Sequence, residues 1–302
     1  MQEHEKVKGI YYALLAFVIW GLVPVYFKAL EHVQPLEVVA HRIIWSAIFL
    51  ALILLVSKRL VDVIRLLRIP SLLLGLFFSA LVISVNWLVF IWAVAQDRIV
   101  ETTLGYFINP LINIVFGFFI FSERLRPLQW LAVALAAVGV IYQLLLFGQL
   151  PWVALVLAVS FASYGVLRKK IQIDAVGGLF IETLWLAPIA LFYLFYLAQS
   201  EELQFLAEGE VTSWLLVAAG IVTSVPLLAF AAGASRISLS LIGIIQYLGP
   251  SIAFLIAVFY YDEPMDLQRL VTFLCIWTGL LVFSVEGLFF QKKKMSAQRT
   301  QG

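Results

Sequence analysis

The chain contains two similar apolar segments, GYFINPLINIVFGFFIFSE at residues 105–123 and IQYLGPSIAFLIAVFYYDE at residues 245–263. Both have one proline, and the two prolines lie 140 positions apart. These prolines are Pro110 and Pro250, and three other pairs share their spacing: Glu123 and Glu263, Gly139 and Gly279, and Trp45 and Trp185. Near the starts of the two copies, Trp20-Gly21 matches Tyr164-Gly165 with a spacing of 144 positions. The chain therefore contains an internal repeat in two copies.

The composition indicates that lipid surrounds most of this repeat. Of the 302 residues, 63% are hydrophobic and 13% are charged, whereas an average soluble protein has about 45–50% apolar and about 25% charged residues. A soluble domain of this length has too much surface to hide so many apolar side chains. Ten segments are apolar over the roughly 20 residues that a membrane-spanning helix needs. They are residues 9–30, 36–57, 70–94, 100–121, 128–147, 151–168, 174–199, 212–234, 239–261 and 266–289.

Each copy of the repeat holds five of these segments. We expect an all-α integral membrane protein with ten transmembrane helices. Residues 1–147 and 148–290 would each form a five-helix repeat, and residues 291–302 a cytoplasmic basic tail. Because five is an odd number, the second repeat would enter the membrane upside down relative to the first. Inverted repeats are typical of secondary transporters, which bind solute near the membrane midplane between the repeats.

The composition also excludes several classes of function. A net charge of +2 provides no strong basic field for nucleic acid. One cysteine, Cys275, and three histidines leave little for a metal site, so no metal is expected. The sequence contains no phosphate-binding loop and no dinucleotide-binding fingerprint. We therefore expect no cofactor and no ATP hydrolysis by the chain itself.

The basic residues predict the orientation, because cytoplasmic segments of membrane proteins carry an excess of Lys and Arg. With a cytoplasmic N-terminus, sixteen of the twenty basic residues fall in cytoplasmic segments, and the outside loop 200–211 has four glutamates and no basic residue. The sixteen are Lys6, Lys8, Lys58, Arg59, Arg65, Arg68, Arg124, Arg126, Arg168, Lys169, Lys170, Arg236, Lys292, Lys293, Lys294 and Arg299. We expect both termini in the cytoplasm.

Two basic stretches lie outside the ten segments. The link 58–69 has polar residues near helical spacing, which predicts either an amphipathic helix on the inner membrane surface or a solvated loop. The tail from Gln291 carries three consecutive lysines, and we expect it to have no fixed structure.

Three prolines predict breaks in the helices. Pro24, Pro110 and Pro250 lack a backbone N–H, so each leaves the carbonyl four residues earlier without its helical partner. Pro110 and Pro250 lie at equivalent positions of the fourth and ninth segments. One interpretation is that these two helices bend and line a central pathway. The other is a static packing kink.

Arg42 and Glu182 are charged residues inside the apolar segments, where ionisable groups are costly and mark functional sites by default. They are related by the 140-residue spacing, and inversion would place Arg42 in the outer half of the membrane and Glu182 in the inner half. Arg42 would hold a substrate carboxylate or a structural acid such as Glu101. Glu101 has Arg98 as an alternative partner. Glu182 would carry a proton or hold a substrate amine.

Further polar and aromatic residues are candidate contacts for a solute. His41 adjoins Arg42, and its titration range suits proton coupling; a local hydrogen bond is the alternative explanation. Trp45, one turn later, would belong to an aromatic wall for a planar solute or would simply pack. Four neutral residues would contact solute or form interhelical hydrogen bonds: Asn86, Tyr106, Asn109 and Gln246.

Several motifs resemble one known family. They are IWGLVPVYFK at 19–28, AHRIIWS at 40–46, VNWLVFIWAV at 85–94, LGYFINPL at 104–111, SERLRPLQW at 122–130 and IQYLGPS at 245–251. Over residues 8–288 the chain resembles the RarD-type branch of the EamA family, in the drug/metabolite transporter superfamily. The resemblance implies ten helices in two inverted repeats around a central cavity, in a bacterial inner membrane. It also implies movement of small organic solutes, often the export of metabolites or amino acids.

We therefore expect a secondary, ATP-independent transporter and not an enzyme. It would export small organic metabolites or drug-like solutes by alternating access, with protons as a candidate coupling ion, and it would act in the lipid bilayer as a monomer or a homodimer. The alternative is a membrane-embedded enzyme that acts on a lipid-linked substrate. Such an enzyme would need acids or histidines clustered at one interface, and those of this sequence are scattered.

Overall fold

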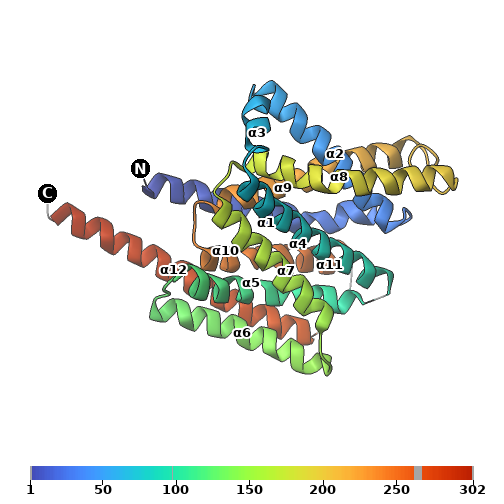
Figure 1. Ribbon diagram of the computed structural model, residues 1–302. Helices are drawn as coiled ribbons and strands as arrows, with labels where there is room; N and C mark the ends of the chain where they lie inside the picture. Colours follow the sequence, from blue (N-terminus) through green and yellow to red (C-terminus); the bar gives the residue numbers. More distant parts are fainter. Residues whose placement is uncertain (1, 97, 262–266, 301–302) are drawn as a thin grey trace.

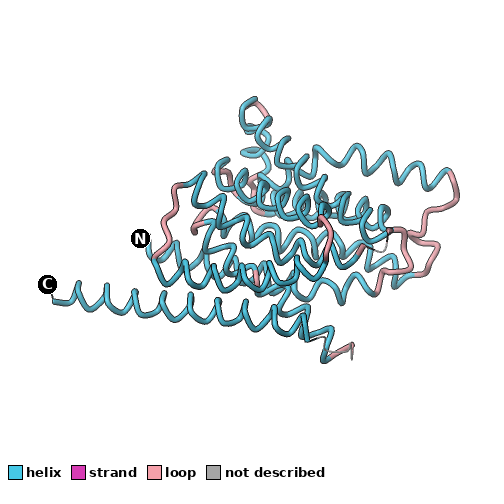
Figure 2. Tube along the Cα trace, turned by 90° about the horizontal axis from the view of Figure 1, so that it is seen from below, coloured by secondary structure: helices cyan, strands magenta, loops and turns pink. Residues whose placement is uncertain are grey.

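The computed structural model describes residues 2–96, 98–261 and 267–300, and all regular elements in these ranges are α-helices. They are α1 (Gln2–Lys28), α2 (Pro35–Val56), α3 (Leu60–Leu66), α4 (Pro70–Ala95), α5 (Ile99–Phe121), α6 (Pro127–Phe147), α7 (Trp152–Ile171), α8 (Ala175–Gln199), α9 (Glu210–Ala234), α10 (Leu239–Gln246), α11 (Leu248–Phe259) and α12 (Leu267–Thr300). Figure 1 shows these helices in one bundle, with the N- and C-termini at the same end. Figure 2 shows the bundle from a second side, where the two termini again lie at the same end and α12 extends beyond the N-terminus.

Ten helical stretches in the described residues are long and apolar enough to cross a membrane, as the sequence predicts. The ninth stretch, Leu239–Phe259, consists of α10 and α11 in succession. Because successive spans alternate in direction and their number is even, both termini lie on one side of the membrane. We call this side the terminal side and the other the opposite side.

The two basic stretches outside the spans are both helical. The link after α2 forms α3, whose Val63 is buried against Leu54, Leu76 and Ile181. The structure therefore confirms a helix, and α3 packs on the bundle through Val63 together with the partly buried Leu60 and Leu66. α12 continues through the tail to Thr300, so the expectation of a tail without fixed structure is wrong. Lys, Gln, Met and Ala favour helix, and adding residues to an existing helix is easier than starting one.

The predicted breaks are present in only one of the three helices. The ninth span is interrupted at Tyr247, between α10 and α11, three residues before Pro250. In contrast, α1 continues through Pro24 and α5 continues through Pro110, so neither helix is interrupted at its proline, and a bend at these two residues stays a prediction. A proline removes one donor, and the surrounding helical hydrogen bonds and neighbouring helices hold the rest of the helix together.

Helices that are distant in the sequence pair closely in space. α2 packs against α8 and α9, α5 against α7 and α10, α6 against α12, and α1 against α9 and α11. In Figure 1, α2, α8 and α9 lie at one edge of the bundle and α6 and α12 at the other, with α1, α4, α5, α7, α10 and α11 between them. Helices α1, α7 and α9 meet in an aromatic cluster that includes Phe17, Tyr164 and Phe230. Each half of the sequence thus contributes helices to the middle of the bundle.

The crossing of α6 and α12 depends on two glycines. A Cβ atom on Gly139 would lie 2.9 Å from the carbonyl oxygen of Thr272, and a Cβ atom on Gly279 would lie 2.7 Å from the carbonyl oxygen of Ala132. Thr272 follows Ala132 by 140 positions, as Gly279 follows Gly139. The two contacts are therefore reciprocal, which is the pattern that a two-fold axis between repeats produces. Glu263, the sequence partner of Glu123, lies outside the described residues.

Replacing Gly279 with alanine is expected to lower the free energy of unfolding by about 1–3 kcal/mol, because the new methyl group would overlap backbone that cannot move away easily. The matched control is Gly287→Ala in the same helix, where nothing lies within 4 Å of the new Cβ atom. Both changes raise helix propensity equally, so the difference between them isolates the crossing. Thermal unfolding in detergent measures it, and equal stability of the two variants would contradict the role of the crossing.

Candidate functional site

Arg42 lies on α2 among groups from four other helices. It is seven residues after Pro35, the first residue of α2, which puts it about 10 Å into the helix from the opposite side. Its Nε atom donates a hydrogen bond of 2.9 Å to the Thr223 hydroxyl on α9. Its guanidinium carbon lies 5.0 Å from the ring centroid of Trp87 on α4 and 5.2 Å from that of Phe27 on α1. Arg42 is therefore held between aromatic rings.

Two tyrosines complete the surroundings of Arg42. Tyr26 on α1 and Tyr106 on α5 are close enough to interact electrostatically with the guanidinium. The Tyr26 hydroxyl donates to the carbonyl oxygen of Leu215, whereas the Tyr106 side chain is half exposed. The sequence predicted Arg42 and Tyr106 as site residues from different spans, and the fold brings them together.

Arg42 has no acid as a partner in the part of the chain that the structure describes. Glu101, one of the two predicted partners, forms an ion pair with Arg98 at 2.7 Å instead. The prediction of an Arg42–Glu101 pair is therefore wrong, and the Arg98 alternative is confirmed. The ion pair is local, because Arg98 and Glu101 are three residues apart at the start of α5. With Nε bonded to Thr223, the other N–H groups of Arg42 make no hydrogen bond to any described residue.

His41 and Glu37 connect α2 to the loop between α8 and α9. Glu37 is completely buried, and its carboxylate accepts hydrogen bonds from the backbone N–H groups of Gln204 (3.0 Å) and Phe205 (2.9 Å). The His41 ring packs on the Phe205 ring, with centroids 4.7 Å apart. Trp45 donates from Nε1 to His41 Nδ1 at 3.2 Å, which leaves the hydrogen of a neutral imidazole on Nε2, facing Glu37 at 3.7 Å. These contacts give His41 and Trp45 a local structural role.

Glu182 lies in a buried ionic cluster near the terminal side. Its Oε1 atom is 3.4 Å from Arg168 Nη1 on α7, and its Oε2 atom accepts a hydrogen bond of 3.3 Å from the Tyr164 hydroxyl. The side chains of Arg168 and Glu182 are only 1% and 2% exposed. A Cβ atom on Gly178 would lie 2.1 Å from Arg168 Nη1, so the absence of a side chain there makes room for the guanidinium.

Arg168 was not predicted as a partner of Glu182. It stands beside Lys169 and Lys170, so the sequence places it among the cytoplasmic basic residues. One feature of the sequence indicates that Arg168 faces the same way as Tyr164, which also contacts Glu182: Arg168 follows Tyr164 by four residues, so the two lie on the same face of a helix. Thr223, the partner of Arg42, carried no such signal, because hydroxyl residues are common within membrane spans.

The remaining predicted residues bind other helices. Asn109 and Gln246 form a buried cluster with a further amide, Asn113: Asn113 Nδ2 donates to Gln246 Oε1 at 2.7 Å, and Gln246 Nε2 donates to Asn109 Oδ1 at 2.5 Å. Asn109 Nδ2 donates to the carbonyl oxygen of Ala158 on α7 at 2.6 Å. Asn86 on α4 donates to the Leu157 carbonyl and the Ser160 hydroxyl, both at 2.9 Å. These hydrogen bonds join α4, α5, α7 and α10.

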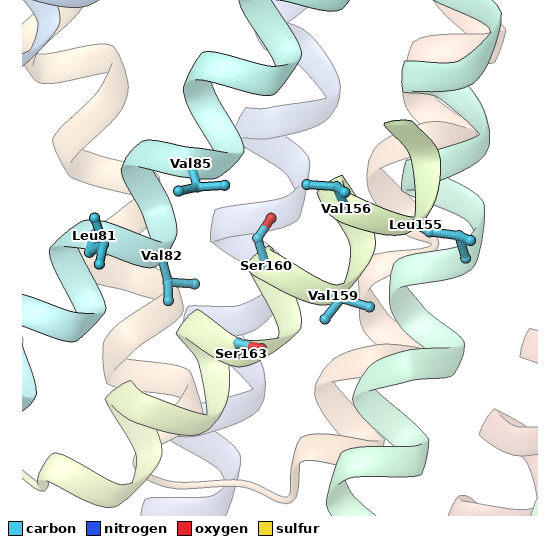
Figure 3. Close-up of a pocket in the computed structure, with 8 residues that line it drawn as sticks. All are labelled: Leu81, Val82, Val85, Leu155, Val156, Val159, Ser160 and Ser163. Carbon is cyan, nitrogen blue, oxygen red and sulfur yellow. The ribbon is translucent and has the colours of Figure 1, made fainter. Parts of the chain in front are cut away.

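An open groove of about 450 Å³ lies between α4 and α7. Figure 3 shows its lining: Leu81, Val82 and Val85 of α4, and Leu155, Val156, Val159, Ser160 and Ser163 of α7. Apart from two serine hydroxyls the lining is aliphatic. None of the predicted site residues lines it, so it is separate from the surroundings of Arg42.

The comparisons with known proteins agree with this fold. The model of the EamA-like transporter family matches residues 7–145 and 151–285. The chain therefore belongs to the EamA-like transporter family, a class of multi-pass membrane transporters. Within the family it is a RarD-type protein, because its similarity to proteins of that name extends over almost the whole chain.

Three relatives illustrate this similarity. The protein RarD of Escherichia coli is 44% identical over 97% of this chain and 99% of its own length. An uncharacterized transporter of Bacillus subtilis, YojE, is 40% identical over 98% of this chain and its full length. A protein of Pseudomonas aeruginosa with the name chloramphenicol-sensitive protein RarD is 33% identical over 91% of this chain and 93% of its own length. A crystal structure with 18% sequence identity has a TM-score of 0.69 over 91% of this chain and 96% of its own, which supports the fold.

Proposed function

We propose that this protein is a secondary transporter that exports small organic solutes by alternating access, and that the solute carries a carboxylate that Arg42 binds. The membrane would be the bacterial inner membrane, with both termini in the cytoplasm, as the distribution of Lys and Arg predicts. The assignment as a membrane transporter rests on membership of the EamA-like transporter family. The proposals for the solute, the direction and the mechanism rest on the residues discussed below.

The observation that carries the proposal is the charge of Arg42. A guanidinium inside a membrane-spanning helix is costly unless an anion or water stabilises it. Among the described residues it has one hydrogen bond and no carboxylate partner, whereas its planar group can bind a carboxylate through two parallel N–H groups. A solute carboxylate would supply the missing anion.

The aromatic groups around Arg42 support a solute with a flat apolar part. Trp87 and Phe27 present rings to the guanidinium, and the half-exposed Tyr106 ring lies on the neighbouring α5. Trp45, one turn after Arg42 on α2, would extend this aromatic surface. Small-molecule sites are commonly lined by apolar and aromatic side chains with a few polar groups that orient the ligand.

The repeat supports alternating access. Arg42 and Glu182 each lie seven residues after the first residue of their helix, α2 or α8. In two inverted five-span repeats, Arg42 would therefore be as deep below one membrane surface as Glu182 is below the other. The reciprocal contacts of Gly139 and Gly279 fit a two-fold relation between the repeats. Rocking of one repeat against the other would expose Arg42 to each side in turn. Glu182 would act at the terminal side, and protonation of Glu182 or His41 is a candidate route for proton coupling.

Binding of matched probes to the purified protein tests the proposal. Phenylacetate and phenylacetamide have nearly the same shape and differ in charge. We expect phenylacetate to raise the temperature of unfolding as its concentration rises, because a ligand that binds only the folded state stabilises it, and phenylacetamide to have no such effect. A panel of metabolites and chloramphenicol, measured at several pH values and followed by flux into proteoliposomes, would extend the test. If no solute stabilises the protein and none is moved into proteoliposomes, the proposal is overturned in favour of an enzyme acting on lipid-linked substrates.

A further inference from the structure

Two lysines contact aromatic rings at the ends of their helices. Lys28 is the last residue of α1, and its Nζ atom lies 3.9 Å from the ring centroid of Tyr261, which follows α11. Lys169 lies in the last turn of α7, and its Nζ atom lies 5.4 Å from the ring centroid of Phe121, the last residue of α5. Both distances are within the range of cation–π attraction.

The two contacts are related by the internal repeat. Tyr261 follows Phe121 by 140 positions, the spacing of the two prolines. The 144-residue spacing near the repeat starts makes Gln172 the partner of Lys28, and Lys169 precedes Gln172 by three residues, about one helical turn, so it lies on the same face. Each contact therefore joins the first span of one repeat to the fourth span of the other.

The two contacts lie on opposite sides of the membrane. Successive spans alternate in direction, so α1 and the α10–α11 span both end on the opposite side, whereas α5 and α7 both end on the terminal side. Arg42 and Tyr106 lie on helices that run between these two levels. A path from Arg42 to one side opens when the first span of one repeat separates from the fourth span of the other on that side. This separation breaks the lysine–ring contact on the same side.

The contact on the terminal side includes further groups. Lys169 Nζ donates to the backbone carbonyls of Ala234, the last residue of α9, and of Ile237 in the turn that follows, and it lies 3.9 Å from Glu123 Oε1. Glu123 in turn accepts hydrogen bonds from the backbone N–H groups of Leu239 (2.7 Å) and Ser240 (2.8 Å), at the start of α10. The turn between α9 and α10 is thus attached to α5 and α7.

A glycine makes this arrangement possible. A Cβ atom on Gly117 would lie 2.4 Å from Glu123 Oε2 and 2.6 Å from the Ser240 hydroxyl oxygen. Without a side chain at Gly117, the Glu123 carboxylate can fold back over the last turn of α5 and reach α10. The side chains of Lys169 and Glu123 are 18% and 13% exposed, so water screens this pair only partly.

We propose that the Lys169–Phe121 contact and the Lys28–Tyr261 contact are two gates, one on each side of the membrane, which open in turn. Both are closed in this structure. Breaking one removes this link on that side only, and the packing deeper in the membrane, such as the Asn109–Ala158 hydrogen bond between α5 and α7, stays in place. Gates need contacts that separate readily, and a cation–π contact at a partly exposed site is weak enough for this, unlike the fully buried Arg168–Glu182 pair. The terminal gate, with its added ion pair and backbone hydrogen bonds, is the stronger of the two.

Side-specific labelling of a cysteine near Arg42 tests the gates without any solute. The background is Cys275→Ser, which removes the one native cysteine, and the reporter is Tyr106→Cys at the half-exposed position beside Arg42. A membrane-impermeant maleimide is added to right-side-out and to inside-out vesicles, and the labelling rate is measured on each side. Lys169→Met should raise the rate from the terminal side and lower it from the opposite side, and Lys28→Met should do the reverse.

The expected change for Lys28→Met is about two- to fivefold, the equivalent of one exposed cation–π contact, and Lys169→Met should give a larger change. Phe121→Leu, which keeps the charge and removes the ring, should act in the same direction as Lys169→Met and provides a second variant if that one folds poorly. The matched control is Arg236→Met on the terminal side, because Arg236 also lies over a ring, that of Tyr12, at 5.4 Å but does not join a first span to a fourth span.

Opposite shifts for the two lysine variants, with no shift for Arg236→Met, would support the gates. Shifts in the same direction, no shift, or an equal shift for Arg236→Met would overturn them. Because no solute is used, this result is independent of the phenylacetate test. A protein that binds no carboxylate could still have both gates, and a transporter of carboxylates could lack them.

Discussion

Replacing Arg42 with glutamine is expected to weaken the binding of phenylacetate by roughly 30-fold to a few thousand-fold. Removing one partner of a buried, hydrogen-bonded charge pair costs about 2–5 kcal/mol, and about 1.4 kcal/mol corresponds to a factor of ten in affinity. Glutamine keeps much of the side-chain volume and its hydrogen-bonding character, so the loss reflects the charge and the paired N–H groups. The dissociation constant comes from unfolding temperatures measured over a range of phenylacetate concentrations.

Two variants separate binding at Arg42 from general effects of charge. Arg42→Lys keeps the positive charge and loses the planar pair of donors, so it should bind with intermediate affinity. Arg65→Gln removes an exposed arginine of α3 that pairs with Asp62, and it should bind as the unmodified protein does. If Arg42→Gln binds phenylacetate and moves solute as well as the unmodified protein, Arg42 does not hold the solute.

Replacing Glu182 with alanine is expected to lower the free energy of unfolding by about 3–5 kcal/mol, because Arg168 would remain buried without its carboxylate. Both side chains of this pair are almost completely inaccessible, so water cannot substitute for the lost partner. Unfolding by a denaturing detergent, followed by the fluorescence of the tryptophans, measures the change. A loss below about 1 kcal/mol would show that the pair is not needed for stability.

A double variant separates the structural role of this pair from a role in transport. Replacing both charges with apolar residues, in Arg168→Met with Glu182→Leu, leaves no uncompensated charge and should restore most of the lost stability. If Glu182 takes part in transport, as proposed, this double variant should be folded and unable to move solute in proteoliposomes. Full flux by the folded double variant would limit the pair to a structural role.

The spans could be predicted from the sequence, and most of their ends differ from the structure by three residues or fewer; the exceptions are the start of α1, at Gln2 and not residue 9, and the end of α12, at Thr300 and not residue 289. The second segment was predicted at 36–57 and forms α2 at Pro35–Val56, and the seventh was predicted at 174–199 and forms α8 at Ala175–Gln199. The reason is that a bilayer imposes one length and one polarity on each crossing. Both properties are contained in a single stretch of sequence, so no knowledge of the partners is required.

The continuity of the helices was harder to predict. Pro110 and Pro250 look equivalent in the sequence, yet α5 is continuous and the ninth span is interrupted at Tyr247. A proline removes the same donor at both places. Whether the helix then stays continuous depends on the neighbours that pack around it, and those differ: α5 lies between α7 and α10, whereas α11 lies against α1.

For the candidate site too, the sequence determined some features and the tertiary structure determined the others. The sequence alone identified Arg42 and Glu182 as the charges to explain, because any ionisable group inside an apolar span stands out. It also showed the 140-residue repeat, which relates Phe121 to Tyr261. Only the tertiary structure decided the partners: Arg168 for Glu182, Thr223 and aromatic rings for Arg42, and Arg98 for Glu101. Hydropathy determines how deep a residue lies in the membrane, but its partner depends on how each helix is rotated and which helix lies beside it, and these follow from packing across the whole bundle.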